Sequence, residues 1–476
     1  MTTITTSEQG RLPLLTKNAG FQRRMAENWG VPDRAPRLAA GLSASTAGHR
    51  DRLSAEWPGA TLVVSAGGAM LRNDDEFFPF RADSDFLWLT GCPSPDAVLV
   101  MFPSGDGHDG VLYLSEPIVA GDPDYVSGRE RSELWMGGAP TLREWSEALA
   151  IEVRGLGSLA GDLGVARSSA LYSAGRPTAA SGLPSELHTR GAAELGRSIS
   201  ELRVVKDDWE IQQLREAVDA TVEGFEAVAS ELRRASEDGG ERWLQGTFDR
   251  IARTRGNTTG YRTIVAAGEH APVLHWTRND GPIRDGDLLL LDAGVEMRTF
   301  YTSDVTRTFP VSGSFTAPQR QVHDLVQAAH EAGMAAVRPG NTFTDFDHAA
   351  MAVIAQGLHD WDLLGVSVDE ALSEQGQHHR RYLICGIGHH LGIDLHDCSK
   401  ARHEHYNGAE LAPGMALTVE PGLYFHAHDQ SVPPELRGIG VRIEDDLVVT
   451  ATGADNLSEA LPRDATGLEN WVRRLR

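Results

Sequence analysis

Apolar residues recur with a helical period just before the middle of the chain. From Ile211 to Leu232 they follow one another at steps of three and four, which places them on one face of an α-helix. Asp207 stands before this stripe, and Glu210 comes three residues after Asp207. This is the spacing of a capping box. A long helix with a core-facing stripe is therefore predicted to begin here.

Beyond this helix, short apolar runs alternate with further helical segments. Thr316 is predicted to open a second helix, with Pro318 in its first turn, and residues 342–358 have a helical pattern as well. Short apolar runs that end in turn residues are typical of strands. The runs predicted as strands are TIVAAG, DLLLLDAG, TRTFPV, MALTVEPGLYF and GVRIEDDLVVT. Helices and strands in separate groups indicate an α+β fold for this half.

The first half of the chain has a different pattern. Residues 1–37 are polar and interrupted by proline, so we interpret them as an N-terminal extension on the surface. Residues 38–200 are predicted to form an α/β domain, in which 153–196, rich in Gly, Ala and Ser, form loops near the boundary. The second domain is then 201–476. The runs predicted as strands in the first domain are ATLVVSAG, DFLWLTG, DAVLVMF and GVLYLS.

Charge and composition exclude several classes of partner. The formal net charge of −23 argues against nucleic acid and against an anionic membrane surface, because both require clustered Lys and Arg. No apolar run reaches the roughly 18 residues of a membrane span, and the N-terminus lacks the pattern of a signal peptide. Cys92, Cys385 and Cys398 are too few for a disulfide framework, which favours a cytoplasmic location.

Four acidic residues stand at the ends of apolar runs, where charges are not expected. They are Asp292, Asp304, Glu420 and Glu444. Each alone could cap a turn or pair with an arginine, since an unpaired buried charge costs several kcal/mol or more. All four, together with the histidines of ICGIGHHLGIDLHD (384–397), indicate a common site. Carboxylates that converge repel one another unless cations lie between them, and two divalent metals would serve that purpose.

The same residues carry a resemblance to a known family. The ordered segments DAG, TSDVTRTF, GIGHHLGIDLHD, LTVEPG and RGIGVRIEDD resemble the dimetal "pita-bread" peptidases, and among these aminopeptidase P. RNDDEFFPFRADSDFLWLTG is similar to the N-terminal domain of that family. The resemblance covers roughly residues 38–455. It implies a pita-bread catalytic domain that follows an α/β N-terminal domain.

The resemblance also implies a ligand set. Asp292 would hold one metal, His389 and Glu420 the other, and Asp304 and Glu444 would bridge the two. Oxygen ligands with one imidazole favour Mn²⁺. A water molecule between two such ions loses a proton easily and becomes the nucleophile, and Glu420 would act as the general base that relays its proton.

Further residues match catalytic and supporting positions of the family. His275 and His396 correspond to catalytic histidines, of which His396 would stabilise the tetrahedral intermediate. Tyr261 and Arg442 correspond to residues that contact the ligands, and Arg442 would orient a metal carboxylate.

Two residues of the glycine-rich segment 384–397 have other interpretations. His390 follows the ligand position, and because adjacent residues of an extended strand point in opposite directions, it is interpreted as structural. Cys385 stands where relatives commonly carry a histidine that handles substrate or protons, and a thiol offers no imidazolium. It is not at a ligand position, and a small buried residue is the expected role.

The predicted function is the release of an N-terminal residue from peptides with proline in second position. The alternative is prolidase, which cleaves Xaa-Pro dipeptides and carries an arginine for the dipeptide carboxylate; residues 403–412 contain none. Methionine aminopeptidases lack so large an N-terminal domain, and creatinases lack the metals. A catalytically weak binding protein on this scaffold remains a further alternative. The resemblance implies a homodimer or homotetramer, and the sequence does not identify the physiological peptide.

Overall fold

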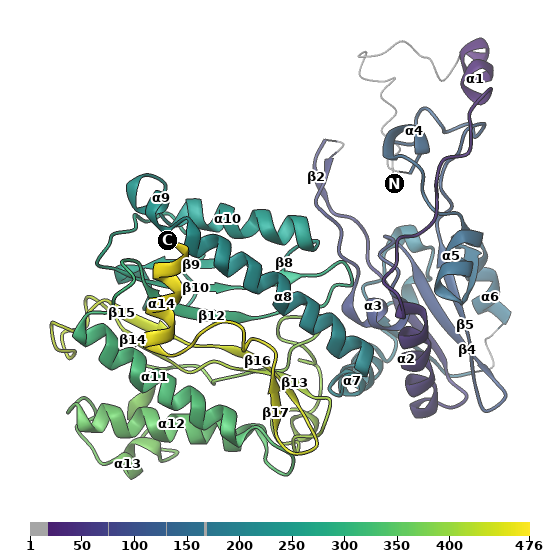
Figure 1. Ribbon diagram of the computed structural model, residues 1–476. Coiled ribbons are helices and arrows are strands. Elements are labelled where there is room, and N and C mark those ends of the chain that lie inside the picture. The colour runs from purple at the N-terminus through teal and green to yellow at the C-terminus, as the bar shows by residue number, and fades with distance from the viewer. Residues whose placement is uncertain (1–17, 75, 130, 166–168) are drawn as a thin grey trace. The chain divides into compact units, whose positions relative to one another are not determined.

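The computed structural model describes residues 18–74, 76–129, 131–165 and 169–476 (Figure 1). The chain divides into two compact units, Met1–Ile199 and Ser200–Arg476. Each unit has its own sheets and its own core, and each is described by itself. Among the described helices, none combines the length and the apolar character needed to cross a bilayer.

The N-terminal unit is built on a five-stranded mixed sheet. Its strand order is β6-β5-β4-β1-β7, in which the outer pairs β5–β6 and β1–β7 are parallel and the inner pairs are antiparallel. The strands are β1 (Thr61–Ser65), β4 (Val98–Ser104), β5 (Gly107–Leu114), β6 (Glu152–Gly155) and β7 (Leu171–Gly175), with a separate hairpin of β2 (Leu71–Asn73) and β3 (Glu76–Phe77). The helices are α1 (Ala19–Ala26), α2 (Leu42–Glu56), α3 (Ser84–Thr90), α4 (Glu133–Met136), α5 (Leu142–Leu149) and α6 (Leu159–Val165).

Two predictions for this unit are wrong. The run DFLWLTG forms the helix α3, which Asp83 caps at its start and Gly91 ends in the left-handed region at φ 66°. Every residue of α3 is buried, and a short apolar run that is buried on all sides has the same pattern in a helix as in a strand. Residues 153–196 are not mainly loops, because they contribute β6, α6 and β7. Both strands lie at the edges of the sheet, where partial exposure weakens the apolar alternation.

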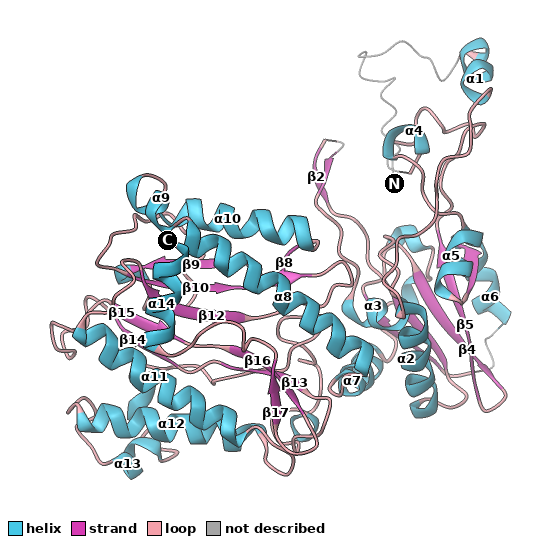
Figure 2. Cartoon of the chain, in the orientation of Figure 1, coloured by secondary structure: helices cyan, strands magenta, loops and turns pink. Residues whose placement is uncertain are grey.

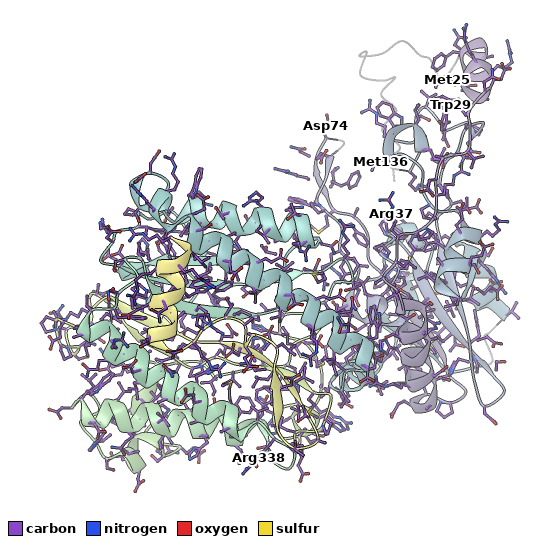
Figure 3. The ribbon with its side chains drawn as sticks, viewed as in Figure 1. Met25, Trp29, Arg37, Asp74, Met136 and Arg338 are labelled. Carbon is purple, nitrogen blue, oxygen red and sulfur yellow. The ribbon has the colours of Figure 1, made fainter. Side chains whose placement is uncertain are left out.

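The predicted extension contains a helix in its described part. Residues 1–17 lie outside the described residues, and Ala19–Ala26 forms α1, none of whose residues is buried. Trp29 follows α1, donates from its indole Nε1 to the carbonyl of Met25 and remains half exposed (Figure 3). Its ring packs edge-on against Tyr125 at 5.6 Å between centroids. Further along the same segment, Arg34 donates from Nη2 to Glu133 Oε2 at 2.8 Å. The segment after α1 is thus held by an aromatic contact and an ion pair within its own unit.

The C-terminal unit consists of several small sheets between pairs of helices (Figures 1 and 2). α7 (Ala192–Arg203) leads into it. Its helices are α8 (Asp208–Ser230), α9 (Leu232–Glu237), α10 (Gly240–Arg255), α11 (Ala317–Ala336), α12 (Phe343–Asp360), α13 (Val368–Leu372) and α14 (Ala465–Leu475). Its strands are β8 (Thr258–Thr259), β9 (Ile264–Ala267), β10 (Leu288–Ala293), β11 (Val295–Glu296), β12 (Val305–Pro310), β13 (Ala416–Val419), β14 (Gly422–Phe425), β15 (Ile439–Arg442), β16 (Asp445–Val449) and β17 (Ala454–Asn456).

The strand β10 lies at the centre of this unit and has helices on both of its faces. It pairs antiparallel with β12 on one side and with β9 on the other. Leu288 and Leu290 join the core that α11 and α12 cover, whereas Leu289 and Leu291 join the core beneath α8 and α10. The run of four leucines is therefore explained by a strand buried on two faces.

The predicted helix starts are confirmed in this unit. Asp207 and Glu210 form the capping box of α8, and Thr316 caps α11 with Pro318 in its first turn. The last two strand runs each split in two: MALTVEPGLYF becomes β13 and β14, and GVRIEDDLVVT becomes β15 and β16. The breaks fall at Glu420 and Glu444, so both carboxylates stand where a strand is interrupted.

Candidate metal centre

The acidic residues predicted from the strand ends come together around one histidine. Asp304, His389 and Glu444 each offer a ligand atom, and these atoms lie within 4.8 Å of one another. The His389 Nε2 atom is 3.2 Å from Asp304 Oδ2 and 3.6 Å from Glu420 Oε1. Asp304 precedes β12, Glu420 follows β13 and Glu444 precedes β16, so strand termini supply the carboxylates.

Asp292, at the end of β10, is bound on both of its oxygens. The Tyr261 hydroxyl donates to Oδ1 at 2.5 Å, and Arg442 Nη2 donates to Oδ2. Arg442 also donates from Nη1 to the Tyr424 hydroxyl at 3.0 Å. Burial raises the pKa of Tyr261 well above its ordinary value, as does the charge of Asp292, so the phenol remains a donor. Tyr261 and Arg442 therefore fix the orientation of Asp292.

Thr306 supports Glu444 and was not predicted from the sequence. Its hydroxyl donates to Glu444 Oε2 at 2.6 Å and accepts from Arg442 Nε at 3.1 Å. Thr306 lies two residues after Asp304, and residues two apart in a strand share a face. That spacing was the signal available in the sequence.

The segment that follows Glu444 is fixed by a buried arginine. Arg307, fully buried, donates to the Glu444 carbonyl at 2.7 Å and to Asp445 Oδ1 at 2.6 Å. Asp446 Oδ2 accepts from the Asp304 backbone N–H at 3.0 Å. Asp446 thus fixes the backbone at Asp304, and Asp445 fixes the backbone at Glu444 through Arg307, roles that the sequence did not reveal.

The crowding of carboxylates shifts their proton affinities upward. Burial raises the pKa of Glu420 to about 7, against the opposing charge of His389. Burial, with the charges of Asp304 and Glu420, raises the pKa of Glu444 well above its ordinary value. Burial alone would lower the pKa of His389, but its hydrogen bond to Asp304 and the charge of Glu420 raise it to about 9. The carboxylates around His389 therefore carry more negative charge than the nearby cationic groups neutralise.

This donor set fits divalent cations. Four carboxylates and one imidazole are ligands that Mn²⁺ and similar borderline ions accept, and the excess of negative charge is what such ions neutralise. Tyr261, Arg442 and Thr306 are bonded to ligand oxygens in the way that residues around metal sites orient their ligands.

The two predicted catalytic histidines lie near this cluster. The ring of His396 packs edge-on against that of His389, with centroids 4.4 Å apart. Burial lowers the pKa of His396, and the charges of His389 and His275 lower it further. Both His275 and His396 are exposed at the surface of the chain, where a substrate can reach them.

His390 faces the apolar core, as the alternation of adjacent residues predicts. It is fully buried, and its ring centroid lies 5.2 Å from that of Phe343 and 4.6 Å from that of Tyr406. Its Nδ1 atom is 3.3 Å from the carbonyl oxygen of Ala416. Burial lowers the pKa of His390 to about 3, so the ring is neutral.

Cys385 is exposed, and the expectation of a small buried residue is wrong. Leu383 and Ile387 anchor the loop in the core, so the residues between them point outward, and Ile384 is 70% exposed. The Cys385 carbonyl accepts from Arg380 Nη1 at 3.0 Å. The residue as a whole is exposed, but surrounding residues of the same chain partly cover the thiol, and this partial burial raises its pKa, with a further contribution from the charge of Glu420. The thiol is therefore near the acidic cluster but is not a member of its ligand group.

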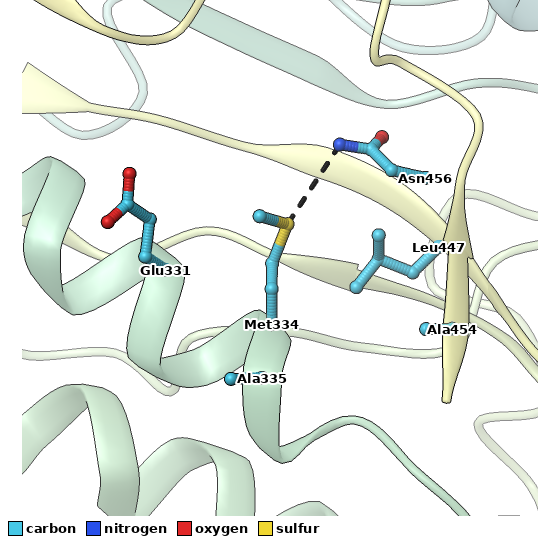
Figure 4. Close-up of a pocket in the computed structure, with 6 residues that line it drawn as sticks. All are labelled: Glu331, Met334, Ala335, Leu447, Ala454 and Asn456. Atoms are coloured by element: carbon cyan, nitrogen blue, oxygen red, sulfur yellow. Dashed lines mark hydrogen bonds between the residues drawn. The ribbon is translucent and has the colours of Figure 1, made fainter. Parts of the chain in front are cut away.

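A separate hollow lies between α11 and β17 (Figure 4). Asn456 reaches from β17 toward the sulfur of Met334, at 3.9 Å. The residues that line the hollow are Glu331, Met334, Ala335, Leu447, Ala454 and Asn456. None of these belongs to the acidic cluster, so the hollow is distinct from the candidate metal centre.

Comparison with protein families agrees with this site. Residues 212–451 match the model of metallopeptidase family M24, and residues 46–167 match that of the aminopeptidase P N-terminal domain. The chain therefore belongs to metallopeptidase family M24, and it is a peptidase.

Relatives within this family extend along nearly the whole chain. Xaa-Pro aminopeptidase 2 of Streptomyces coelicolor is 46% identical over 466 residues, which are 96% of this chain and 97% of that protein. Xaa-Pro aminopeptidase of Escherichia coli is 32% identical, over 87% of this chain and 93% of that protein. The structure of E. coli aminopeptidase P with the inhibitor Pro-Leu matches with a TM-score of 0.79 at 28% identity, over 93% of this chain and 100% of that chain. The predicted α+β class and pita-bread architecture are confirmed.

Proposed function

We propose that this protein is an Xaa-Pro aminopeptidase that removes the N-terminal residue from peptides with proline in second position. The observation that carries the proposal is the cluster of Asp292, Asp304, His389, Glu420 and Glu444, in a chain that is 46% identical to a named Xaa-Pro aminopeptidase. A peptide bond to proline lacks an N–H, so an enzyme must recognise it without that donor.

The five clustered residues are proposed to hold two divalent ions, most favourably Mn²⁺. Asp292 would bind one ion, His389 and Glu420 the other, and Asp304 and Glu444 both. Such ions supply an activated water molecule and polarise the scissile carbonyl. The oxygen-rich donor set supports Mn²⁺ over a structural zinc ion.

The remaining chemistry belongs to the side chains. Glu420 is proposed to accept a proton from the attacking water and to deliver it to the leaving nitrogen; a general base of this kind works best with a pKa near the operating pH. Burial raises the pKa of Glu420 to about 7, which is in that range. His396 and His275 would donate hydrogen bonds to the oxygen that gains charge. Arg442 and Tyr261 would keep Asp292 in place.

Prolidase is the second candidate function. Residues 403–412 contain no arginine that could receive a dipeptide carboxylate, and the preceding Arg402 is engaged by Glu201 through contacts of 2.7 and 2.9 Å. This pairing favours the aminopeptidase over the dipeptidase.

Assembly, location and domain limits are part of the same proposal. A homodimer or homotetramer would cover the exposed Trp135 and Met136 of the N-terminal unit. Three free cysteines favour a cytoplasmic location. The proposed domains are an extension over 1–37, an aminopeptidase P N-terminal domain over 38–200 and a catalytic domain over 201–476.

The test is to incubate the purified protein with Mn²⁺ and to offer Xaa-Pro-Yaa tripeptides beside Xaa-Pro dipeptides, with products identified by mass spectrometry. Release of Xaa from tripeptides, with dipeptides spared or cut slowly, is the expected result. Cleavage of dipeptides alone would replace the proposal with prolidase. No turnover in a metal-loaded protein would overturn it in favour of a binding protein.

A further inference from the structure

The segment that carries His275 lies between β9 and β10, and a buried carboxylate lies beneath it. This carboxylate belongs to Glu241, in the first turn of α10, and its side chain is fully buried. A charge buried to this extent is stabilised only when donors saturate it. Glu241 meets that condition through the His275 segment itself.

Four N–H groups converge on Glu241, two on each oxygen. Oε1 accepts from the backbone of Ala267 at 2.9 Å and lies 2.7 Å from His270 Nδ1. Oε2 accepts from the Trp276 indole and from the backbone of Gly281, both at 2.7 Å. The contacts fall at the beginning, the middle and the end of residues 267–281. A single side chain therefore joins both ends of this segment to its middle.

The backbone at Glu241 completes the closure. Its N–H donates to the Gly281 carbonyl at 3.0 Å, so Glu241 and Gly281 bond to each other in both directions. A Cβ atom at Gly281 would lie 2.4 Å from the His270 ring and 2.9 Å from Glu241 Oε2. Only glycine allows this close approach.

Trp276, next to His275, is held on more than its indole N–H. Its ring is stacked against His270 at 3.8 Å between centroids, and the Arg278 guanidinium lies 4.3 Å from its centroid. Asn279, fully buried, accepts from Val265 N–H and donates to the Thr263 carbonyl, both at 2.9 Å. His275 itself is exposed, yet the residues on both of its sides are fixed to Glu241 and to β9.

We propose that Glu241 is a positioning residue for His275, which it serves by closing residues 267–281 around one buried carboxylate. The inference rests on the proposed function, because it assumes that His275 contacts the substrate. Among the described residues, no side-chain hydrogen bond joins Glu241 to a proposed metal ligand. Its replacement should therefore reduce turnover and leave metal binding unchanged.

The bonding pattern shows why an amide cannot replace this carboxylate. Glu241→Gln would turn one acceptor oxygen into an NH₂ group that faces two N–H donors, so two hydrogen bonds would be lost and the donors left unsatisfied. A displacement of about 1 Å in a catalytic group can reduce turnover about 100-fold. We expect kcat of Glu241→Gln to fall by roughly 10- to 100-fold while KM changes little.

The experiment is a double-mutant cycle with Glu241→Gln, His275→Ala and the double variant, all loaded with Mn²⁺ and assayed on an Xaa-Pro-Yaa tripeptide. If Glu241 acts through His275, the double variant should be no slower than His275→Ala. Hydrogen exchange of residues 267–281, followed by mass spectrometry, should be faster in Glu241→Gln than in the wild type. Metal content should be the same in both. Glu269→Gln, which removes an exposed carboxylate from the same segment, is the matched control and should leave exchange and turnover unchanged.

Trp276→Phe covers the case in which Glu241→Gln fails to fold, because it removes one donor to Glu241 and keeps the aromatic ring. It should show the same effects on exchange and turnover in smaller measure. Three results would each overturn the role of Glu241. They are a double variant whose loss of kcat is the product of the two single losses, hydrogen exchange of residues 267–281 that is unchanged in Glu241→Gln, and full activity of His275→Ala. An inactive wild type would instead overturn the proposed function, and the exchange measurement distinguishes that failure from the first.

Discussion

At the scale of single residues, the candidate metal centre depends on neutral side chains as much as on charged ones. Thr306 has one hydroxyl, which donates to Glu444 and accepts from Arg442. Its hydrogen therefore points to the carboxylate and its lone pair to the guanidinium. The two charged groups are held in one geometry by a residue that carries no charge.

Replacement of Thr306 by valine should weaken metal binding. The variant keeps the shape of the side chain but removes the hydrogen-bond partner of Glu444 Oε2 and of Arg442 Nε. Such changes typically reduce metal affinity about 10- to 100-fold. Titration of the metal-free protein with Mn²⁺ by calorimetry measures the effect. Thr306→Ser retains the hydroxyl and should bind nearly as the wild type does; equal losses in both variants would contradict the role of the hydroxyl.

Cys385 should be the reactive thiol of this protein. It is exposed near the acidic cluster, whereas Cys92 and Cys398 are buried. Partial burial of the thiol and the charge of Glu420 raise its pKa, so the thiolate fraction and the rate of alkylation should increase from pH 7 to pH 9. Iodoacetamide should add one adduct, identified by peptide mapping, and should inhibit cleavage because the adduct would occupy space beside Glu420. Cys385→Ser should resist this inhibition, and inhibition that persists there would place the sensitive residue elsewhere.

At the scale of elements, α8 and α10, which cover one face of β10, can pack closely because α8 carries a glycine at their interface. α8 and α10 pack through Phe225 and Phe248, whose rings meet edge-on at 6.1 Å. A Cβ atom at Gly224 would lie 2.5 Å from the Phe248 ring. On the outer face of α10, a Cβ atom at Gly246 would meet nothing within 4 Å.

These two glycines should respond in opposite directions to alanine. Gly224→Ala overpacks the interface and should lower the free energy of unfolding by about 1–3 kcal/mol. Gly246→Ala improves helix propensity without a clash and should raise it by about 0.5–1 kcal/mol. Urea unfolding of each variant measures the differences, and a stabilised Gly224→Ala would show that the helices can move apart freely.

The elements also show which patterns are informative. Capping residues such as Thr316 act within one turn, so they predicted where α8 and α11 begin. The apolar run of α3 was misread because a segment buried on every side has no amphipathic period. The breaks at Glu420 and Glu444 were not predicted, although Pro421 and Gly422 follow the first acid and Asp445 and Asp446 follow the second.

At the scale of the whole molecule, a buried histidine should make stability depend on pH. His330 on α11 is fully buried, with Nε2 3.3 Å from Asp445 Oδ2, and burial lowers its pKa from 6.5 to about 4. Between these values the unfolded chain binds a proton that the folded chain does not. Stability from this residue is therefore complete above about pH 6.5 and decreases as the pH falls toward 4.

The size of this effect can be isolated by substitution. A shift of this magnitude corresponds to about 3 kcal/mol at 1.36 kcal/mol per pKa unit. Between pH 7 and pH 4, His330→Gln should lose about 3 kcal/mol less unfolding free energy than the wild type, because the amide does not titrate. Denaturant titrations at several pH values measure both slopes. Parallel slopes would mean that His330 is protonated equally in both states.

Removal of metal should affect both activity and stability. Ions that bind the folded chain stabilise it by mass action, by about 4 kcal/mol at 1,000 times the dissociation constant. A chelator should therefore abolish cleavage and lower the unfolding temperature of the C-terminal unit, and added Mn²⁺ should restore both. Asp304→Asn should show little response to chelator or metal in the same calorimetric scan. If neither the chelator nor added Mn²⁺ changed the unfolding temperature of the wild type, this result would contradict the proposed metal centre.

The sequence by itself determined the features that short segments encode. Net charge, the caps of α8 and α11 and the apolar run that forms β10 could be read directly along the chain. The family segments placed Asp292, Asp304, His389, Glu420 and Glu444 in one predicted site. Periodicity and capping depend on neighbours within a few positions, and the family segments are contiguous.

Only the tertiary structure decided which distant residues support them. Glu241 lies 34 positions before His275, and Thr306, Arg307 and Asp446 reach the cluster through contacts between strands that are far apart in the chain. A buried polar group takes its partners from whichever backbone or side-chain donors packing brings within about 3 Å, and no local pattern records that choice. The exposure of Cys385 and the burial of Glu241 follow from the same cause, because burial is a property of the assembled core.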